Sequence, residues 1–246
     1  MDETYNTLGI VIDRVNYREK DLLVNFFSFD RGLMKLVARG AKKINSKLAG
    51  HLEPMNLIEA MVVRGKGFNY LGTALNKNCF LNIKKDFEKI IQIGKVFNLK
   101  KKFLKENNCD IENFLLLRDY LFFLDFNYKI SDFDFLYSVY RFKFLQKLGY
   151  EPELKRCFLC KKNIFNFNDN LFQFSFLNGS LICKNCFLKS QNQNQKNIFI
   201  LNQDLLKILI IILNKDFFYL SKINIKKKIN IELSNFLDNL FQFHLN

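Results

Sequence analysis

Cys157-Phe158-Leu159-Cys160 is followed, after 22 residues, by Cys183-Lys184-Asn185-Cys186, and these two C-x-x-C pairs decide how the second half of the chain is organised. Each pair places two sulfur atoms about one turn apart, so that both can bind the same ion. Four thiolates around Zn²⁺ form a closed tetrahedral site with no position left for water or substrate. The spacing therefore predicts one structural zinc, with free buried cysteines or disulfides as the alternatives.

The 22-residue spacer is slightly longer than the roughly 15–20 residues typical of such sites, and its sequence predicts a hairpin that absorbs the difference. Leu171–Leu177 is rich in Phe, Asn178-Gly179 is a strong turn signal, and Leu181-Ile182 leads back to the second pair. The Gln/Asn-rich stretch that follows, Ser190–Asn197, is typical of a loop.

The sequence shows neither the pattern of a signal peptide nor that of a membrane-spanning segment. No apolar run follows a basic segment at the N-terminus, and the longest apolar run, Ile208–Leu213, is far shorter than the roughly 20 residues that span a bilayer. We therefore expect a cytoplasmic, nucleoid-associated protein without membrane contact, in a reducing compartment that favours metal over disulfides. Cys79 and Cys109, which lie outside the two pairs, are expected to be core residues.

Residues 1–82 predict a barrel of short strands. Leu8, Ile10 and Ile12 alternate along the first strand, and a basic, irregular stretch at Ala41–Leu52 interrupts the series after the third. Five strands with one insertion at that position match an OB-fold, a small Greek-key barrel. The later strands are expected at Asp21–Phe29, Leu33–Arg39, Met55–Val63 and Phe68–Phe80.

Residues 83–246 predict a helical domain that carries the zinc knuckle as an insertion at 151–190. Apolar residues follow helical spacing at Phe87, Ile90, Ile91 and Phe97. Further helices are expected at Asp110–Phe126, after Asp132, from Asn202 or Asp204 to Leu213, and at Lys226–Phe243. The fold class is α+β, an N-terminal OB-fold β-barrel followed by an α-helical domain with an inserted four-cysteine zinc knuckle.

The charge of the chain predicts a polyanionic partner. The formal net charge is +14 at pH 7, and the four thiolates and one Zn²⁺ together would lower it to +12. Because Lys is abundant throughout, the position of charge is more informative than its total. The basic residues of the barrel lie on one strand, in the insertion and in the turns, where an OB-fold binds nucleic-acid strands. The predicted DNA contacts are Arg31, Lys35, Arg39, Lys42, Lys43, Lys47, Arg64 and Lys66.

Groups for other chemistry are scarce. Tyr17, Phe68 and Tyr70 are candidates for stacking on bases, although core packing is the favoured role for each. The chain has two His and none of the phosphate-binding or nucleophile motifs. His51-Leu52-Glu53 has the H-x-E form of a zinc deaminase, but Arg156 rather than Pro precedes the first C-x-x-C pair. That motif would also leave the second C-x-x-C pair without a role, so no catalytic residue is predicted.

Two blocks of sequence resemble those of RecO, a family of bacterial recombination mediators and DNA-repair proteins. The N-terminal block comprises Thr7–Val24, Val37–Lys43, Ser46-Lys47-Leu48, Leu52-Glu53-Pro54 and Arg64-Gly65. The C-terminal block comprises Phe144–Cys160 and Asn178–Cys186. Asn178-Gly179-Ser180 departs from the Gly-Gly that often precedes the second knuckle in the family, which changes the turn but not the ligands. Residues 83–130 match poorly, so no partner-binding residue is carried over from them.

The resemblance implies a function and assigns residues to it. Members of the family bind single- and double-stranded DNA, anneal strands coated by single-strand-binding protein, and act with RecR to load RecA. By this resemblance Lys35, Arg39 and Lys43 contact DNA, and Cys157, Cys160, Cys183 and Cys186 bind zinc. The chain is thus expected to be a non-enzymatic recombination mediator. The alternatives are an RNA-binding or ribosome-associated structural zinc protein and, with less support, a zinc-dependent hydrolase or deaminase.

Overall fold

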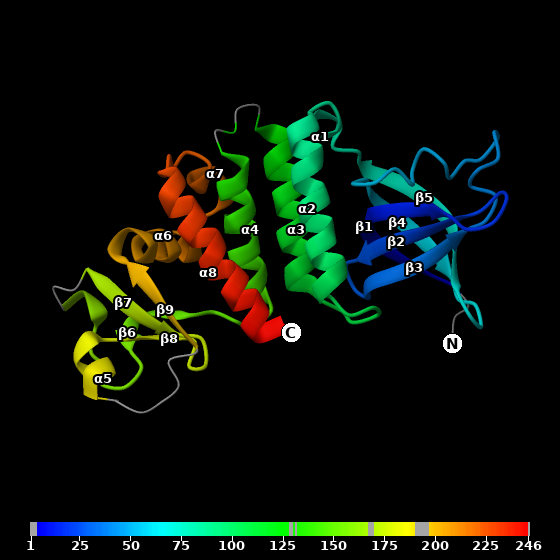
Figure 1. Ribbon diagram of the computed structural model, residues 1–246. Helices are drawn as coiled ribbons and strands as arrows, with labels where there is room; N and C mark the ends of the chain where they lie inside the picture. Colours follow the sequence, from blue (N-terminus) through cyan, green and yellow to red (C-terminus); the bar gives the residue numbers. More distant parts are fainter. Residues whose placement is uncertain (1–3, 128–129, 131, 167–169, 190–196, 246) are drawn as a thin grey trace. The chain divides into compact units, whose positions relative to one another are not determined.

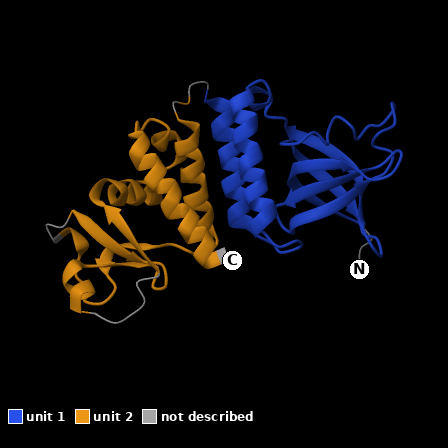
Figure 2. Cartoon of the chain, viewed as in Figure 1, with its two compact units in different colours: residues 1–129 blue, residues 130–246 orange. Residues whose placement is uncertain are grey.

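The computed structural model describes residues 4–127, 130, 132–166, 170–189 and 197–245 (Figure 1). The chain divides into two compact units, Met1–Lys129 and Ile130–Asn246 (Figure 2). The predicted domain boundary at residue 82 falls inside the first unit, within the short helix Leu81–Lys84 that follows its last strand. The loop expected at Ser190–Asn197 lies outside the described residues except for Asn197.

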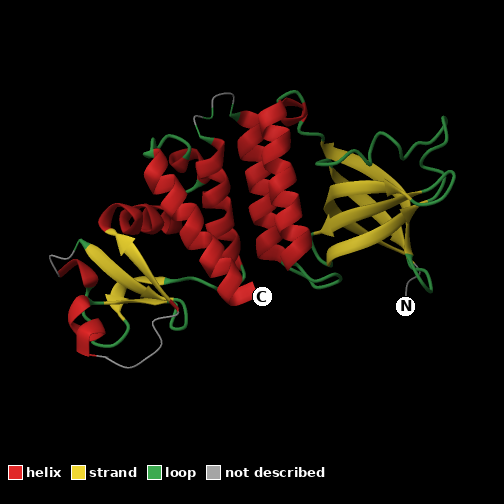
Figure 3. Cartoon of the chain, viewed as in Figure 1, coloured by secondary structure: helices red, strands yellow, loops and turns green. Residues whose placement is uncertain are grey.

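The first unit begins with a closed barrel, whose strands are drawn in yellow in Figure 3. It has five strands in the order β1-β2-β3-β5-β4. All neighbouring strands are antiparallel except β3 and β5, which pair in parallel over two residues. This order confirms the barrel predicted from the alternating pattern. Its core contains the side chains of Val24, Phe26, Leu36 and Val62, each no more than 1% exposed. The strands are β1 (Thr4–Asn16), β2 (Leu22–Ser28), β3 (Gly32–Ala38), β4 (Leu57–Val63) and β5 (Asn69–Asn78).

In the described part of the first unit, three helices follow the barrel: α1 (Leu81–Lys84), α2 (Phe87–Phe103) and α3 (Ile111–Phe126). Helices α2 and α3 are tied by two buried lysines of α2. Lys89 Nζ donates to the carbonyl oxygen of Asn127 at 2.7 Å, and Lys100 Nζ donates to that of Asn113 at 2.9 Å. The buried face of α2 therefore includes polar residues whose partners lie on or next to α3.

The inward face of α2 differs from the apolar stripe in the sequence. Phe87, Ile90 and Ile91 are 75%, 37% and 44% exposed, whereas Ile93 and Val96 are fully buried. The difference arises because buried lysines occupy positions that a simple hydrophobic pattern assigns to the surface.

The second unit combines a helical part with a small sheet. Asp132 and Asn202 cap α4 and α6 by accepting hydrogen bonds from Phe135 N and Leu205 N, so Asn202 rather than Asp204 begins the latter helix. The helices are α4 (Phe133–Lys147), α5 (Lys184–Lys189), α6 (Gln203–Asn214), α7 (Phe217–Leu220) and α8 (Lys227–Leu245), with a 3₁₀ turn at Ile164–Asn166.

The predicted hairpin between the cysteine pairs is present, but it is part of a larger sheet. Strands β7 (Leu171–Ser175) and β8 (Ser180–Ile182) pair antiparallel, and Gly179 in the connection has φ of +58°. Two strands that the sequence pattern did not indicate, β6 (Glu153–Cys157) and β9 (Ile198–Asn202), extend the sheet to the order β6-β8-β7-β9. The cysteines are thus held by a four-stranded sheet and the start of α5.

Candidate nucleic-acid interface and metal centre

The four cysteines of the two C-x-x-C pairs lie together in the second unit. All four Sγ atoms lie within 4.8 Å of one another, and Cys160 Sγ and Cys183 Sγ are 3.9 Å apart. A tetrahedral ion with metal–sulfur bonds of about 2.3 Å places its ligand atoms about 3.8 Å apart. Cys157 and Cys183 are buried. The group predicted from the spacing, Cys157, Cys160, Cys183 and Cys186, therefore could hold a metal ion.

The electrostatics of the cysteine group favour a bound cation. Burial raises the pKa of Cys157, but hydrogen bonds from the N–H groups of Cys183, Cys160 and Leu159 outweigh that effect. The pKa is therefore lowered, to about 7. The pKa of Cys186 is raised to about 12, chiefly by its hydrogen bond to Cys183 and by burial. Four neighbouring thiols cannot all ionise unless a cation offsets their charge.

The carboxylate of Glu53, in the deaminase-like motif of the sequence, forms an ion pair with Arg14 at 2.5 Å.

On the barrel, two turns meet through exposed aromatic rings. Tyr17 in the β1–β2 turn and Phe68 in the β4–β5 turn have ring centroids 5.8 Å apart and are 37% and 42% exposed. Core packing, the role favoured for both from the sequence, is therefore wrong. A Cβ on Gly65 would lie 2.2 Å from the carbonyl oxygen of Phe68, so the β4–β5 turn requires glycine there. These are the two turns that, in OB-folds, flank the nucleic-acid groove.

Basic side chains surround this aromatic pair, which we call the Tyr17–Phe68 pair. Arg18 lies with its guanidinium carbon 5.2 Å from the Tyr17 ring. Arg39 lies 4.0 Å from the Tyr70 ring, which it covers on one side. The stretch after β3 is joined to the β1–β2 turn because Lys42 N donates to Lys20 O at 3.0 Å. Within the described residues, no ion pair is formed by the exposed side chains of Lys42, Lys43, Lys47 and Lys66.

The other predicted DNA contacts fall into two further groups. Arg31 and Arg64 lie 4.0 and 5.5 Å from the ring of Tyr5, beside a hollow of about 380 Å³. Lys35 forms an ion pair of 2.5 Å with Glu106. The structure thus brings Arg31 and Arg64 together. It places an anionic partner on both Lys35 and Arg31, whose Nε lies 3.7 Å from Asp30 Oδ2. No local signal in the sequence indicates the partner of Lys35, because Glu106 lies in the α2–α3 loop.

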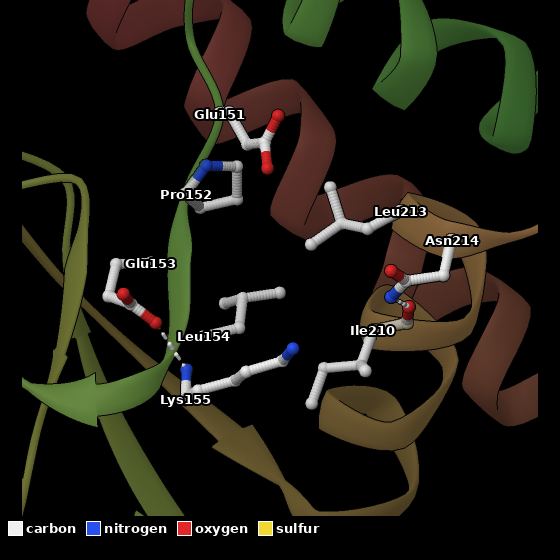
Figure 4. Close-up of a pocket in the computed structure, with 8 residues that line it drawn as sticks. All are labelled: Glu151, Pro152, Glu153, Leu154, Lys155, Ile210, Leu213 and Asn214. Atoms are coloured by element: carbon white, nitrogen blue, oxygen red, sulfur yellow. Dashed lines mark hydrogen bonds between the residues drawn. The ribbon is translucent and has the colours of Figure 1, made fainter. Parts of the chain in front are cut away.

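A second hollow, of about 390 Å³, lies in the second unit between β6 and α6 (Figure 4). Its walls carry the carboxylates of Glu151 and Glu153, and the side chain of Lys155 extends toward Ile210 (Figure 4). Two carboxylates against one ammonium do not favour a polyanion, so this hollow does not extend the basic surface. Within the parts of the chain that the structure describes, no helix combines the length and apolar character needed to cross a bilayer.

Comparison with known proteins covers nearly the whole chain. Residues 1–78 match the family model "Recombination protein O N terminal", and residues 85–246 match "Recombination protein O C terminal". A DNA repair protein RecO of Thermodesulfovibrio yellowstonii is 26% identical over 96% of this chain and 91% of its own length. One of Caldanaerobacter subterraneus is 27% identical over 97% and 92%.

These names describe a protein of recombination and repair rather than an enzyme, in agreement with the shortage of catalytic groups in the sequence. The N-terminal match covers the barrel, and the C-terminal match covers helices α2 to α8 and the four cysteines. On the strength of these matches, the chain belongs to the RecO family of DNA repair proteins.

Proposed function

We propose that this chain is a DNA-binding recombination mediator that anneals complementary single strands and, with RecR, helps to load RecA onto strands coated by single-strand-binding protein. The observation that carries the proposal is the exposed Tyr17–Phe68 pair among basic side chains at the OB-fold turns. Aromatic rings stack on bases of any identity, and basic groups follow the phosphates, so the surface suits a single strand of any sequence.

The mechanism is electrostatic. Two complementary strands repel each other through their phosphates, and a basic surface that binds both lowers this repulsion. Each neutralised phosphate also releases counterions, so affinity for single- and double-stranded DNA should fall steeply with salt. Contacts to phosphates position a strand without selecting a sequence. Bases not held by stacking stay available for pairing with the second strand.

The four-cysteine group is proposed to bind one structural Zn²⁺. Thiolates are ligands that zinc prefers, and four of them leave no open coordination position. The ion would link β6 to the start of α5, because Cys157 ends that strand and Cys186 lies on that helix. Its role is to stabilise the sheet of the second unit, so it takes no part in a reaction.

Strand annealing tests the proposal directly. Complementary single strands coated with single-strand-binding protein are mixed with the protein, with and without RecR, and duplex formation is followed by fluorescence energy transfer. We expect faster annealing, with a rate that falls as salt rises. A structural RNA-binding protein has no reason to anneal coated DNA. Duplex formation at the rate seen without the protein, at low and moderate salt, would refute the proposed function.

A further inference from the structure

The hollow beside Tyr5 is lined by segments that are far apart in the sequence. Asp30 and Arg31 come from the β2–β3 turn, Arg64 from the β4–β5 turn, and Asn107 and Cys109 from the α2–α3 loop. This convergence depends on Gly32, whose φ is +71°. Because Gly32 has no side chain, the α2–α3 loop can approach so closely that a Cβ on Gly32 would lie 1.9 Å from the carbonyl oxygen of Asn108.

The α2–α3 loop is also hydrogen bonded to the barrel at this place. Asn107 N donates to Leu33 O at 2.8 Å, and the carboxylate of Glu106 pairs with Lys35. Cys109 Sγ lies 3.8 Å from the carbonyl oxygen of Phe29. The wall of the hollow is therefore fixed to the barrel by several contacts, all within the first unit. Cys109 is exposed rather than part of the core, which corrects the expectation from the sequence.

Two guanidinium groups share one tyrosine ring in this hollow. Arg31 and Arg64 lie 4.0 and 5.5 Å from the ring centroid of Tyr5. The Nε atom of Arg31 is buried and makes no hydrogen bond within the described residues. Its distance to Asp30 Oδ2, 3.7 Å, is too long for one. Nε itself is covered, but the Arg31 side chain as a whole is 40% exposed, so its outer amino groups can donate to a ligand oxygen in the hollow.

Among the residues that the structure describes, Asp30 is the one carboxylate that lines the hollow, and it is already engaged. Its Oδ1 accepts hydrogen bonds from Thr7 and from Ser28, the latter at 2.8 Å. Burial alone would raise the pKa of Asp30, but these hydrogen bonds and the charge of Arg31 lower it overall, so the carboxylate is ionised. Among the described residues that line the hollow, two guanidinium groups against one carboxylate leave a formal charge of +1, which favours an anion.

From this arrangement we propose that the hollow binds a phosphate group of a nucleic-acid strand, held between Arg31 and Arg64. Planar guanidinium groups suit phosphate oxygens because they can donate two parallel hydrogen bonds. The β4–β5 turn carries both Arg64 and Phe68, so a strand stacked on the Tyr17–Phe68 pair continues past Arg64 into the hollow. The inference rests on the proposed function, since it gives a bound DNA strand a fixed phosphate contact on the barrel.

Cys109 provides a built-in reporter for this site. The protein is saturated with a single strand of about 12 nucleotides, a length within the range that one OB-fold covers, and saturation is checked by fluorescence anisotropy. Iodoacetamide is then added, and alkylation of Cys109 is followed by mass spectrometry, with Cys79 as the internal reference. We expect Cys109 to react about tenfold more slowly when nine-tenths of the protein is bound, and Cys79 to react at an unchanged rate.

A matched pair of variants assigns the effect to Arg31. Arg31→Gln removes one phosphate contact, so the slope of log affinity against log salt should fall by about 0.7 for a single strand. It should also abolish the protection of Cys109 at equal saturation. Arg118→Gln makes the same change of charge on α3, where Arg118 pairs with Asp119, and should preserve both the slope and the protection.

The source of the phosphate is separated by three strands: linear with a 5′-phosphate, linear without one, and circular. Protection of Cys109 by the phosphorylated strand alone assigns the hollow to a strand end, and equal protection by all three assigns it to backbone phosphates. Either result supports the site. Saturated binding with Cys109 reacting at its free rate would overturn the inference and leave the proposed function standing. Failure of every strand to bind would overturn both.

Discussion

Lys100 allows a sharp test of how α2 and α3 are held together. Its side chain is fully buried, its Nζ donates to Asn113 O at 2.9 Å, and it lies 5.0 Å from the ring of Phe27. Burial lowers the pKa of Lys100 from 10.5 to about 7, and the charge of Asp110 opposes part of that change. At neutral pH the folded protein therefore holds this amine only partly protonated.

The magnitude follows from proton linkage. Between pH 7 and pH 9 the unfolded chain keeps the proton on Lys100, whereas the folded protein releases it. Because the unfolded state then binds more protons, the free energy of unfolding rises with pH across this window. For a pKa of 7 folded and 10.5 unfolded, the gain is about 2 kcal/mol. The gain levels off above the unfolded pKa, and below pH 7 little pH dependence from this residue remains.

The measurement is the free energy of unfolding of the first unit in urea, followed by far-ultraviolet circular dichroism at pH 7 and pH 9. Lys100→Met should lose the gain of about 2 kcal/mol, while Lys101→Met, which changes an exposed lysine paired with Asp13 at 2.8 Å, should keep it. The difference between the two pH values matters more than absolute stability, because Met also leaves Asn113 O without its donor. An equal gain in Lys100→Met and the parent would refute the assigned pKa.

Three further predictions follow from the sites. Arg39→Glu should weaken DNA binding in an anisotropy titration more than Lys35→Glu does, because Glu106 already neutralises Lys35; the reverse order would contradict this. Cys157→Ser should lower the zinc content measured by atomic absorption and reduce the melting temperature of the second unit, with DNA affinity of the barrel preserved; full zinc occupancy in the variant would count against the site. Gly32→Ala should lower the free energy of unfolding by more than 1 kcal/mol, because its φ of +71° and the adjacent loop backbone leave no room for a Cβ; equal urea midpoints would show that the loop can move away.

Local signals in the sequence were sufficient for the barrel strands and for several helix starts. Alternation of apolar residues gave the five strands of the barrel, and side-chain caps gave the starts of two helices. Asp110 accepts from Asn113 N at 3.0 Å and Asp132 from Phe135 N at 2.8 Å, as expected for N-caps. The two C-x-x-C pairs likewise predicted a group of four cysteines, because their spacing is itself the geometric signal.

Contacts between distant segments were beyond the sequence pattern. The pairing of Lys35 with Glu106 and the exposure of Cys109 both depend on where the α2–α3 loop lies, which no local periodicity specifies. The hollow has the same origin, since Tyr5 and Arg64 are brought to Arg31 by barrel closure. Strand β6 was missed because its polar sequence, with three charged residues in five, does not alternate in the usual way.

The docking of the α2–α3 loop on β3 has a practical consequence for dissecting this protein. Strand β3 pairs with β5 over two residues only, and the bridge from Leu33 to Glu106 covers part of its remaining length. Phe114 on α3 also packs on the barrel, 5.7 Å from the ring of Phe27. A fragment that stops after the last barrel strand would uncover unpaired backbone and an aromatic patch, and it should self-associate. A fragment ending at residue 129 keeps both protected, and it is still small enough for solution NMR.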